Sequence, residues 1–329
     1  MTAAVLSSRQ PSSPALRPVN PRRDMKAVAD LIETVFANEM DPMGTRMVRD
    51  MRAYGRAGIF GYLLGRLLLP AAAYPKGYVW EEENDIIGNA SLLRVEGFET
   101  RWVLANIAVR SEYRRRGIGR KLTQACIDFA QEQGAQELFL QVASSNQGAQ
   151  VMYAALGFRP LVTRSIWRRG KSDVVLTSAD TGQTRMRRDG EWTEQLTLAE
   201  RLHPEGLVWP YPLTASLYKS SILDQLIGSI AQRHWVWVES GRMLASLAAR
   251  YSADQNHWRL ILVVEPEMRG QLERPMVSAA LMALAGPRRE MVLDYSPGLA
   301  DQAFMDLGFK PERTLTWMSN DLGTKIKRE

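Results

Sequence analysis

Cysteine and histidine are scarce in this chain of 329 residues, which contains one Cys and three His. A single cysteine, Cys126, cannot form an internal disulfide, which excludes a disulfide-stapled fold and suits a reducing compartment such as the cytoplasm. Cys126 lies among apolar residues of a predicted helix, so a small core residue is expected there rather than a nucleophile. The histidines, His203, His234 and His257, lack the spacing of metal ligands, and no metal site is predicted.

Long apolar runs are also missing. The most apolar stretch, residues 59–74, is too short for a spanning helix and contains Arg66 and Pro70, so no membrane span is predicted. The simpler interpretation of this stretch is a buried or interfacial helix. The more specific hypothesis is an apolar wall that faces a bound hydrophobic or peptide-like molecule. Residues 1–14 lack the apolar core of a signal peptide and are expected to form a disordered lead-in.

The charge is unevenly distributed. The net charge is +6, and residues 1–180 hold 24 Lys and Arg against 18 Asp and Glu, so the remainder of the chain is balanced. Such an excess usually reflects solvated surface, but it also suits a polyanionic ligand or a nucleic acid. Because no nucleic-acid-binding motif accompanies it, a small polyanion is favoured and no nucleic-acid partner is predicted.

Helical and strand periodicities alternate through the first half of the chain. Helices are predicted over residues 23–37, 45–69, 119–133 and 146–156, and strands over residues 77–82, 86–95, 102–109, 138–142 and 172–178. The polar residues 83–85 separate the first two strands and predict a turn.

An internal repeat is indicated by two similar segments, AQVMYAALGFRP at 149–160 and ADQAFMDLGFKP at 300–311. Apolar strand-like runs precede the two copies by similar distances. We therefore predict two copies of one fold, with residues 15–180 as the first domain, 181–191 as a polar linker and 192–329 as the second domain.

The strongest local motif is ANIAVRSEYRRRGIGRKL, in which a predicted strand ends at Val109 and a helix begins near Gly119. Successive backbone N–H groups of a glycine-containing loop, with the positive end of the following helix, form an anion cradle. Gly117 and Gly119 carry no side chains that would block a diphosphate, and the surrounding arginines add charge. On its own, such a turn would more often be a solvated loop.

A second motif comes next at Asn146-x-x-Ala149-x-x-x-Tyr153 and closes with Gly157 and Phe158. Offsets of three and four place Asn146, Ala149 and Tyr153 on one helix face, and Asn146 is a good N-cap. Taken alone, Tyr153 would be interpreted as a half-buried aromatic on an amphipathic helix.

In motif order, spacing and strand–loop–helix context, these segments together resemble the GNAT acetyltransferase family over about residues 15–178. The resemblance implies an α+β fold with two tandem GNAT-like domains, each a mixed, mostly antiparallel sheet flanked by helices. It also implies acetyl-CoA as co-substrate and an amine, either a small molecule or a peptide N-terminus, as acceptor.

The resemblance further implies roles for individual residues. The coenzyme A pyrophosphate would bind the loop formed by Arg114, Arg115, Arg116, Gly117, Ile118, Gly119 and Arg120. The backbone of Ile107, Ala108 and Val109 would pair with the pantetheine arm, and Asn146 would contact the cofactor further along. Tyr153 would be the general acid that protonates the coenzyme A thiolate, because a phenol near its ordinary pKa is protonated at neutral pH.

Within the family, the local sequence is most similar to ribosomal-protein alanine N-acetyltransferases, but it departs from them at one position. That group carries a glutamate as general base where this chain has Gln141, and an amide cannot take a proton from an ammonium group. Glu112, Glu39, Asp41 and Glu96 are conceivable substitutes, each more readily interpreted as surface charge. An acetyl-CoA-binding protein without catalysis, acting as a sensor or inactive paralogue, is therefore the alternative to an active enzyme.

The second copy has lost the corresponding motifs. Pro297 and Phe304 stand at the positions of Asn146 and Tyr153. The equivalent of the loop lacks the paired glycines and carries Glu265, Glu267 and Glu273, whose carboxylates would oppose a diphosphate. The second domain is therefore predicted not to turn over acetyl-CoA, and either to complete the core or to shape the acceptor cleft.

Overall fold

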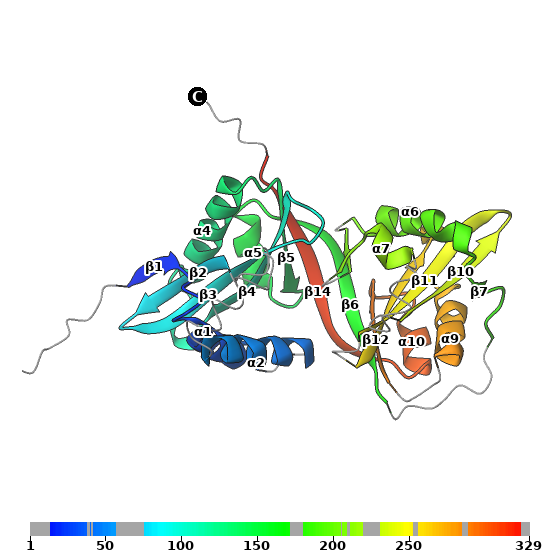
Figure 1. The fold of residues 1–329 in the computed structure, drawn as a ribbon, viewed down its shortest axis with the longest axis horizontal. Helices are drawn as coiled ribbons and strands as arrows, with labels where there is room; N and C mark the ends of the chain where they lie inside the picture. The colour runs from blue at the N-terminus through cyan, green and yellow to red at the C-terminus, as the bar shows by residue number, and fades with distance from the viewer. Residues whose placement is uncertain are drawn as a thin grey trace, which may run out of the picture. The chain divides into compact units, whose positions relative to one another are not determined.

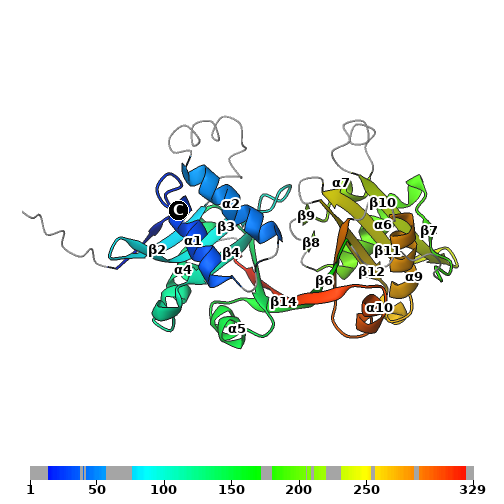
Figure 2. The ribbon, with the colours of Figure 1, turned by 90° about the horizontal axis from the view of Figure 1, so that it is seen from below.

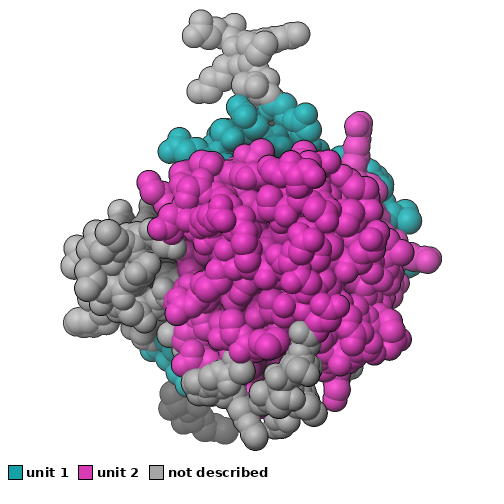
Figure 3. All heavy atoms as spheres, turned by 90° about the vertical axis from the view of Figure 1, so that its right-hand side faces the viewer, with its two compact units in different colours: residues 1–140, 151–158, 320–329 teal, residues 141–150, 159–319 magenta. Residues whose placement is uncertain are grey.

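The computed structural model describes residues 14–37, 40, 42–56, 76–171, 180–204, 206–208, 211–219, 231–252, 256–284 and 289–323. Contacts divide the chain into two compact units (Figures 1 and 3). Unit 1 comprises residues 1–140, 151–158 and 320–329, and unit 2 comprises residues 141–150 and 159–319. Each unit therefore contains segments that are distant in the sequence.

The sheet of unit 1 consists of five strands in chain order. They are β1 (Ala15–Pro18), β2 (Lys76–Glu82), β3 (Asp85–Arg94), β4 (Arg101–Val109) and β5 (Glu137–Ala143), whose last residues belong to unit 2. All neighbours are antiparallel except β4 and β5, which are parallel. Glu83 and Asn84 both have positive φ, of 51° and 68°, which is the geometry of a tight hairpin turn and confirms the turn predicted there.

Helices cover both faces of this sheet. Figure 1 shows α1 (Met25–Val35) and α2 (Pro42–Arg56) on one face and α4 (Ile118–Glu132) on the other. The apolar stripe of α1, which includes Val28 and Ile32, packs with Val79 of β2 and Ala108 of β4. This arrangement is a consequence of the helical spacing of the apolar residues.

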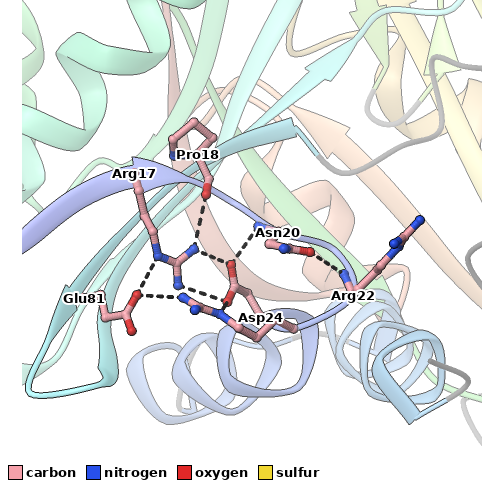
Figure 4. Close-up of polar contacts among 7 residues, drawn as sticks. Arg17, Pro18, Asn20, Arg22, Asp24 and Glu81 are labelled. Atoms are coloured by element: carbon pink, nitrogen blue, oxygen red, sulfur yellow. Dashed lines mark hydrogen bonds and ion pairs between the residues drawn. The ribbon is translucent and has the colours of Figure 1, made fainter. Parts of the chain in front are cut away.

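An ionic network around the buried Asp24 links β1 and the start of α1 to β2 (Figure 4). Asp24, 1% exposed, accepts hydrogen bonds from the Arg17 guanidinium at 2.6 and 3.0 Å and from the Asn20 backbone N–H at 2.7 Å. Arg17 and Arg23 also donate to Glu81 of β2, at 2.5 and 2.8 Å. Burial alone would raise the pKa of Asp24, but these donors outweigh it and hold the pKa below its usual value.

Unit 2 contains a seven-stranded sheet in the order β14-β6-β13-β12-β11-β10-β7. Its strands are β6 (Arg159–Arg169), β7 (Arg185–Met186), β10 (Gln232–Glu239), β11 (Arg242–Ser252), β12 (His257–Val264), β13 (Glu290–Tyr295) and β14 (Lys310–Asp321). Two short strands, β8 (Leu207–Val208) and β9 (Tyr211–Pro212), pair separately. Among the described residues of the second half, the helices are α6 (Trp192–Leu202), α7 (Ala215–Tyr218), α9 (Glu273–Ala283) and α10 (Asp301–Asp306).

Strand β12 shows how this sheet separates two hydrophobic cores. All eight of its residues are buried. Leu260 and Leu262 lie in the core that contains α9 residues, whereas Ile261 and Val263 lie in the core that contains α6 and α7 residues. Alternate side chains of a strand point to opposite faces, so a continuous apolar run is expected in a strand covered on both sides.

The two halves repeat the same order of elements, which confirms the tandem α+β fold. In the first half, β3, β4, α4, β5, α5 (Gln147–Ala154) and β6 succeed one another, and in the second half β11, β12, α9, β13, α10 and β14 do. A three-residue 3-10 turn comes after the central strand of each half, at Ser111–Tyr113 and at Pro266–Met268. The domain boundaries along the sequence stay a prediction, because the compact units combine segments from both halves.

Several predicted segments lie outside the described residues, and two parts of the described structure differ from the prediction. The lead-in up to residue 13, the apolar segment 59–74 and the strand expected at 172–178 all lie outside them. Strand β6, at Arg159–Arg169, is an element that the periodicity did not indicate. Residues 181–191 contain β7, which pairs with β10, so this stretch contributes to the sheet of unit 2.

Candidate functional site

Strand β4 contains a bulge. Asn106 has a positive φ of 54°, and the pairing register between β3 and β4 shifts between Asn89 and Ser91. The buried Asn89 side chain donates a hydrogen bond of 2.9 Å to the carbonyl oxygen of Asn106 and so satisfies the backbone at the bulge. A bulge bends its strand and changes the direction of the residues after it.

Beyond the bulge, β4 has an unpaired edge. Its parallel pairing with β5 joins Arg101–Leu104 to Glu137–Leu140 and stops there. Among the described residues, Ala105–Val109 therefore have no strand partner on that side. Ile107, Ala108 and Val109 all lie on this stretch, and the Ala108 side chain is buried in the α1 core, so a ligand would meet chiefly backbone here. An unpaired strand edge can accept an extended chain as an added strand.

The loop after β4 leads into α4 through two left-handed residues, Arg115 at φ 64° and Gly117 at φ 77°. Gly117 is the N-cap of α4; no side chain caps the helix and no acidic residue occupies its first turn. A Cβ on Gly117 would meet nothing within 4 Å, so the loop has free space in front of it. Ile118 is buried, and only its backbone can serve a ligand. Free N–H groups at the positive end of a helix suit an anion.

The arginines of the loop are exposed and form its positive rim. Arg114 donates to the Val109 carbonyl oxygen at 3.2 Å, which holds it at the end of β4. Arg116 lies over the Tyr113 ring at 4.8 Å, while Arg115 and Arg120 are exposed. Exposed arginines keep their charge and can form bidentate contacts with phosphate oxygens.

Helix α5 lies next to this loop. A Cβ on Gly119 would lie 3.7 Å from the Met152 sulfur and 3.9 Å from Val109 Cγ2, so the helix, the loop and the end of β4 meet at one place. At the start of α5, Asn146 is exposed and its side-chain oxygen accepts the Ala149 N–H at 3.1 Å, which confirms the predicted N-cap.

Tyr153 is the residue after Met152 on α5 and is 5% exposed. Its ring packs edge-on against Phe158, with centroids 5.9 Å apart. Within the described part of the chain, no group is hydrogen-bonded to its hydroxyl. Burial raises the pKa of this phenol well above the ordinary value that the sequence suggested, which keeps the proton on the oxygen throughout the neutral range.

Gln141 and two of the four carboxylates considered as a general base, Glu112 and Glu96, lie among the described residues. Gln141 is half-buried on β5. Glu112 is exposed, and hydrogen bonds from its own backbone N–H and from the Ser111 hydroxyl hold its pKa below the usual value. Glu96 is exposed, and Glu39 and Asp41 lie outside the described residues.

The equivalent place in the second half is closed by its own side chains. Glu273, the first residue of α9, is 1% exposed and accepts a hydrogen bond of 2.7 Å from the Tyr295 hydroxyl. Strand β12 pairs with β11 without a bulge, and Phe304, fully buried, occupies the position of Tyr153. A buried carboxylate at the helix N-terminus leaves no room for an anion, which supports the prediction of an inactive second half.

The residues that the sequence did not indicate are Asn89 and Asn106. Asparagine tolerates positive φ better than other residues with a Cβ, and this was the one signal available for the bulge. Within the described ranges, no cluster of three or more His, Cys, Asp or Glu side chains could hold a metal ion. The helices described there are all too short or too polar to cross a membrane.

The acetyltransferase (GNAT) family model matches residues 49–158. The chain is 42% identical over 62 residues to N-alpha-acetyltransferase 30 of Schizosaccharomyces pombe, and 41% identical over 61 residues to the [ribosomal protein bS18]-alanine N-acetyltransferase of Escherichia coli. These stretches make up 19% and 18% of this chain and 41% of each relative. The chain thus matches less than half the length of these relatives.

Two solved structures are similar over nearly the whole chain. A GCN5-related N-acetyltransferase from Sphaerobacter thermophilus superimposes with a TM-score of 0.60 at 14% identity, covering 94% of this chain and 96% of that one. A tandem GNAT protein from the clavulanic acid biosynthesis pathway gives a TM-score of 0.52 at 16% identity, with coverages of 94% and 99%. At these identities the similarity shows the fold, and it is the tandem fold.

Proposed function

We propose that this chain, which belongs through its first half to the GNAT acetyltransferase family, transfers the acetyl group of acetyl-CoA to a primary amine. A small-molecule amine or a peptide N-terminus would serve as acceptor, and the one buried cysteine suits a cytoplasmic setting. The family match and the site around β4, α4 and α5 support the transferase class.

Each part of the site has a task in this proposal. The backbone of Ile107, Ala108 and Val109 pairs with the pantetheine arm along the free edge of β4. The N–H groups from Gly117 to Arg120 bind the pyrophosphate, and Arg114, Arg115 and Arg116 neutralise its charge. Asn146, exposed at the start of α5, contacts the cofactor further along.

The chemical step requires one proton donor. The amine nitrogen attacks the acetyl carbonyl carbon, an N–C bond forms, and the C–S bond breaks with its electron pair staying on sulfur. Tyr153 gives its proton to that sulfur, and the proton released by the amine passes to solvent water. Because burial raises the pKa of Tyr153, the phenol carries its proton throughout the neutral range and has it in place when negative charge develops on the sulfur. The phenolate left behind takes a proton back from solvent water.

The observation that carries the proposal is the hydroxyl of Tyr153. It is held in a mostly buried side chain, none of the described groups bonds to it, and Met152 of the same helix lies next to Gly119. A hydroxyl on a mostly buried side chain that bonds to no group of its own fold is available to a ligand.

The test is thiol release from acetyl-CoA by the full chain, with Tyr153→Phe as the matched variant. Phe304 occupies the same position in the second half, fully buried, so the fold tolerates phenylalanine there. We expect kcat to fall on the order of a hundredfold or more, while acetyl-CoA affinity is retained. Equal kcat in the two proteins would refute the role of Tyr153.

A non-catalytic acetyl-CoA sensor is the second candidate, and Gln141 favours it. An amide on β5 cannot remove the proton of an ammonium group, so turnover depends on amine that is already neutral. Tight binding of acetyl-CoA without turnover of any amine would support the sensor.

A further inference from the structure

The ends of the helices α5 and α10 receive the same kind of hydrogen bond, each from a distant strand. The Leu156 carbonyl oxygen accepts the Asn320 side-chain N–H at 3.0 Å. The Leu307 carbonyl oxygen accepts the Arg169 Nε–H at 2.9 Å. Leu156 and Leu307 occupy equivalent positions in the two repeats.

The two donors are equivalent as well, and each comes from the other repeat. Arg169 ends β6, the last strand of the first repeat, and Asn320 lies near the end of β14, the last strand of the second. Arg169 lies as many residues after Phe158 as Asn320 lies after Phe309. The two repeats have therefore exchanged their last strands, and each strand ends on the helix of the other repeat.

Strand pairing supports the exchange. Within unit 2, β6 pairs antiparallel with β13 of the second repeat, and β6 and β14 run side by side (Figure 2). Also within unit 2, Ser144, the residue after β5, donates hydrogen bonds of 3.0 Å from its N–H and its hydroxyl to the Thr314 carbonyl oxygen. Within unit 1, the Leu322 N–H donates to the Gln136 carbonyl oxygen at 2.8 Å.

Asn320 acts on the turn that carries Tyr153. Gly157 has φ 93°, and a Cβ on it would lie 3.2–3.3 Å from the amide atoms of Asn320, so this amide lies directly over the turn. The Tyr153 carbonyl oxygen accepts the N–H groups of Leu156 and Phe158 at 2.9 and 3.0 Å. The bond from Asn320 thus holds the Leu156–Gly157 peptide, which lies between the two N–H groups that bind the Tyr153 carbonyl oxygen. The Phe158 ring, which follows this peptide, packs against the Tyr153 ring.

We propose that Asn320, supplied by the second repeat, is a positioning residue for Tyr153 in the first. The inference rests on the proposed function, because it assigns Asn320 a task in the same proton transfer. It also gives the second repeat, whose cofactor site is closed, a function: its last strand completes the active site of the first repeat. A misplacement of about 1 Å at a reacting group can cost on the order of a hundredfold in rate.

The test uses full-length variants of Asn320 with a control at Arg169. Asn320→Asp keeps the shape but removes the donor, and Asn320→Arg restores a donor of the kind that Arg169 supplies in the second repeat. Arg169→Met is the matched control, since it removes the equivalent bond at α10. For each variant, kcat, the KM for acetyl-CoA and the thermal midpoint are measured, and Asn320→Asp is combined with Tyr153→Phe.

We expect Asn320→Asp to lower kcat roughly tenfold to a hundredfold with little change in KM, and Asn320→Arg to recover most of the loss. Arg169→Met should keep the wild-type kcat. In the Tyr153→Phe background, Asn320→Asp should cost nothing further, because the group it positions is already gone.

Two results would overturn the inference while the proposed function stands. One is an unchanged kcat in Asn320→Asp, and the other is an equal loss in the Tyr153→Phe background, which indicates a general structural effect. Absence of turnover in the wild-type chain would instead refute the proposed function, and this inference with it.

Discussion

Gly119 gives a variant in which stability and cofactor binding should change in opposite directions. It is the second residue of α4, and its φ lies outside the left-handed region, so alanine can adopt its backbone conformation. A Cβ would meet the Met152 sulfur at 3.7 Å and Val109 Cγ2 at 3.9 Å, which are ordinary van der Waals distances. Alanine is therefore expected to fit the protein itself without strain.

The expected magnitudes can be worked out from these contacts. Alanine is a better helix former than glycine, so Gly119→Ala should stabilise the protein by about 0.5 kcal/mol, a rise of roughly 1–2 °C in the thermal midpoint. The same methyl group is expected to crowd a diphosphate bound at the N-terminus of α4. Loss of one hydrogen bond to a charged group costs about 1.5–3 kcal/mol, which corresponds to roughly a tenfold to hundredfold weaker Kd for acetyl-CoA.

Calorimetric titration with acetyl-CoA and a thermal melt of the same preparation measure both quantities. Gly190→Ala is the control, because a Cβ there meets nothing within 4 Å and the residue belongs to unit 2 and not to the loop. Unchanged acetyl-CoA affinity in Gly119→Ala would refute the assignment of the loop as the pyrophosphate site. A clear loss of stability would show that alanine does not fit against Met152 and Val109.

Other parts of the structure give four further predictions. Asp24→Asn should lower the free energy of unfolding by about 3 kcal/mol at pH 7, because it breaks the ion pair of a buried carboxylate. Folding lowers the pKa of Asp24 from its ordinary value of 3.8, so the difference in urea midpoint between the variant and the wild type should shrink as the pH falls below about 4. A difference that does not change with pH would contradict this. Cys126 is fully buried with its pKa raised by burial to about 12, so a disulfide reagent at pH 8 should label it only after denaturation, and rapid labelling of the native protein would refute its burial. Gln141→Glu should raise kcat/KM at pH 7 by supplying the missing base, and an unchanged rate would mean that deprotonation of the amine does not limit turnover. Calorimetry of the wild-type chain should find one acetyl-CoA per chain, because Glu273 closes the second site, and two sites would contradict this.

Local sequence patterns were sufficient to predict many features of the first repeat. The glycine and arginine spacing predicted the loop and the start of α4, and the structure begins that helix at Ile118. The N-cap at Asn146 and the hairpin turn at Glu83 and Asn84 also depend on neighbouring residues alone, and they were predicted correctly. These features arise within a few residues, where propensity and periodicity act.

Non-local features could not be predicted in this way. Strand β6, with the sequence RPLVTRSIWRR, gains its strand partners from β13 and β14, more than a hundred residues later. The bulge at Asn106 depends on the Asn89 side chain of the neighbouring strand. The raised pKa of Tyr153 depends on burial in the folded unit, and the sequence suggested an ordinary value. Asn320 lies in the last strand of the chain, and nothing in its own segment indicates a contact with Leu156.

The central claim is that the first half of this chain catalyses acetyl transfer to an amine. The most direct measurement is coenzyme A release from acetyl-CoA by the full-length wild-type protein, followed with a disulfide reagent, across peptides with free N-termini, lysine derivatives, polyamines and small amines. We predict release that requires both enzyme and one class of amine, at a rate that rises with pH as that amine loses its proton. Tight binding of acetyl-CoA with no amine-dependent release from any member of the panel would contradict the claim and favour the sensor.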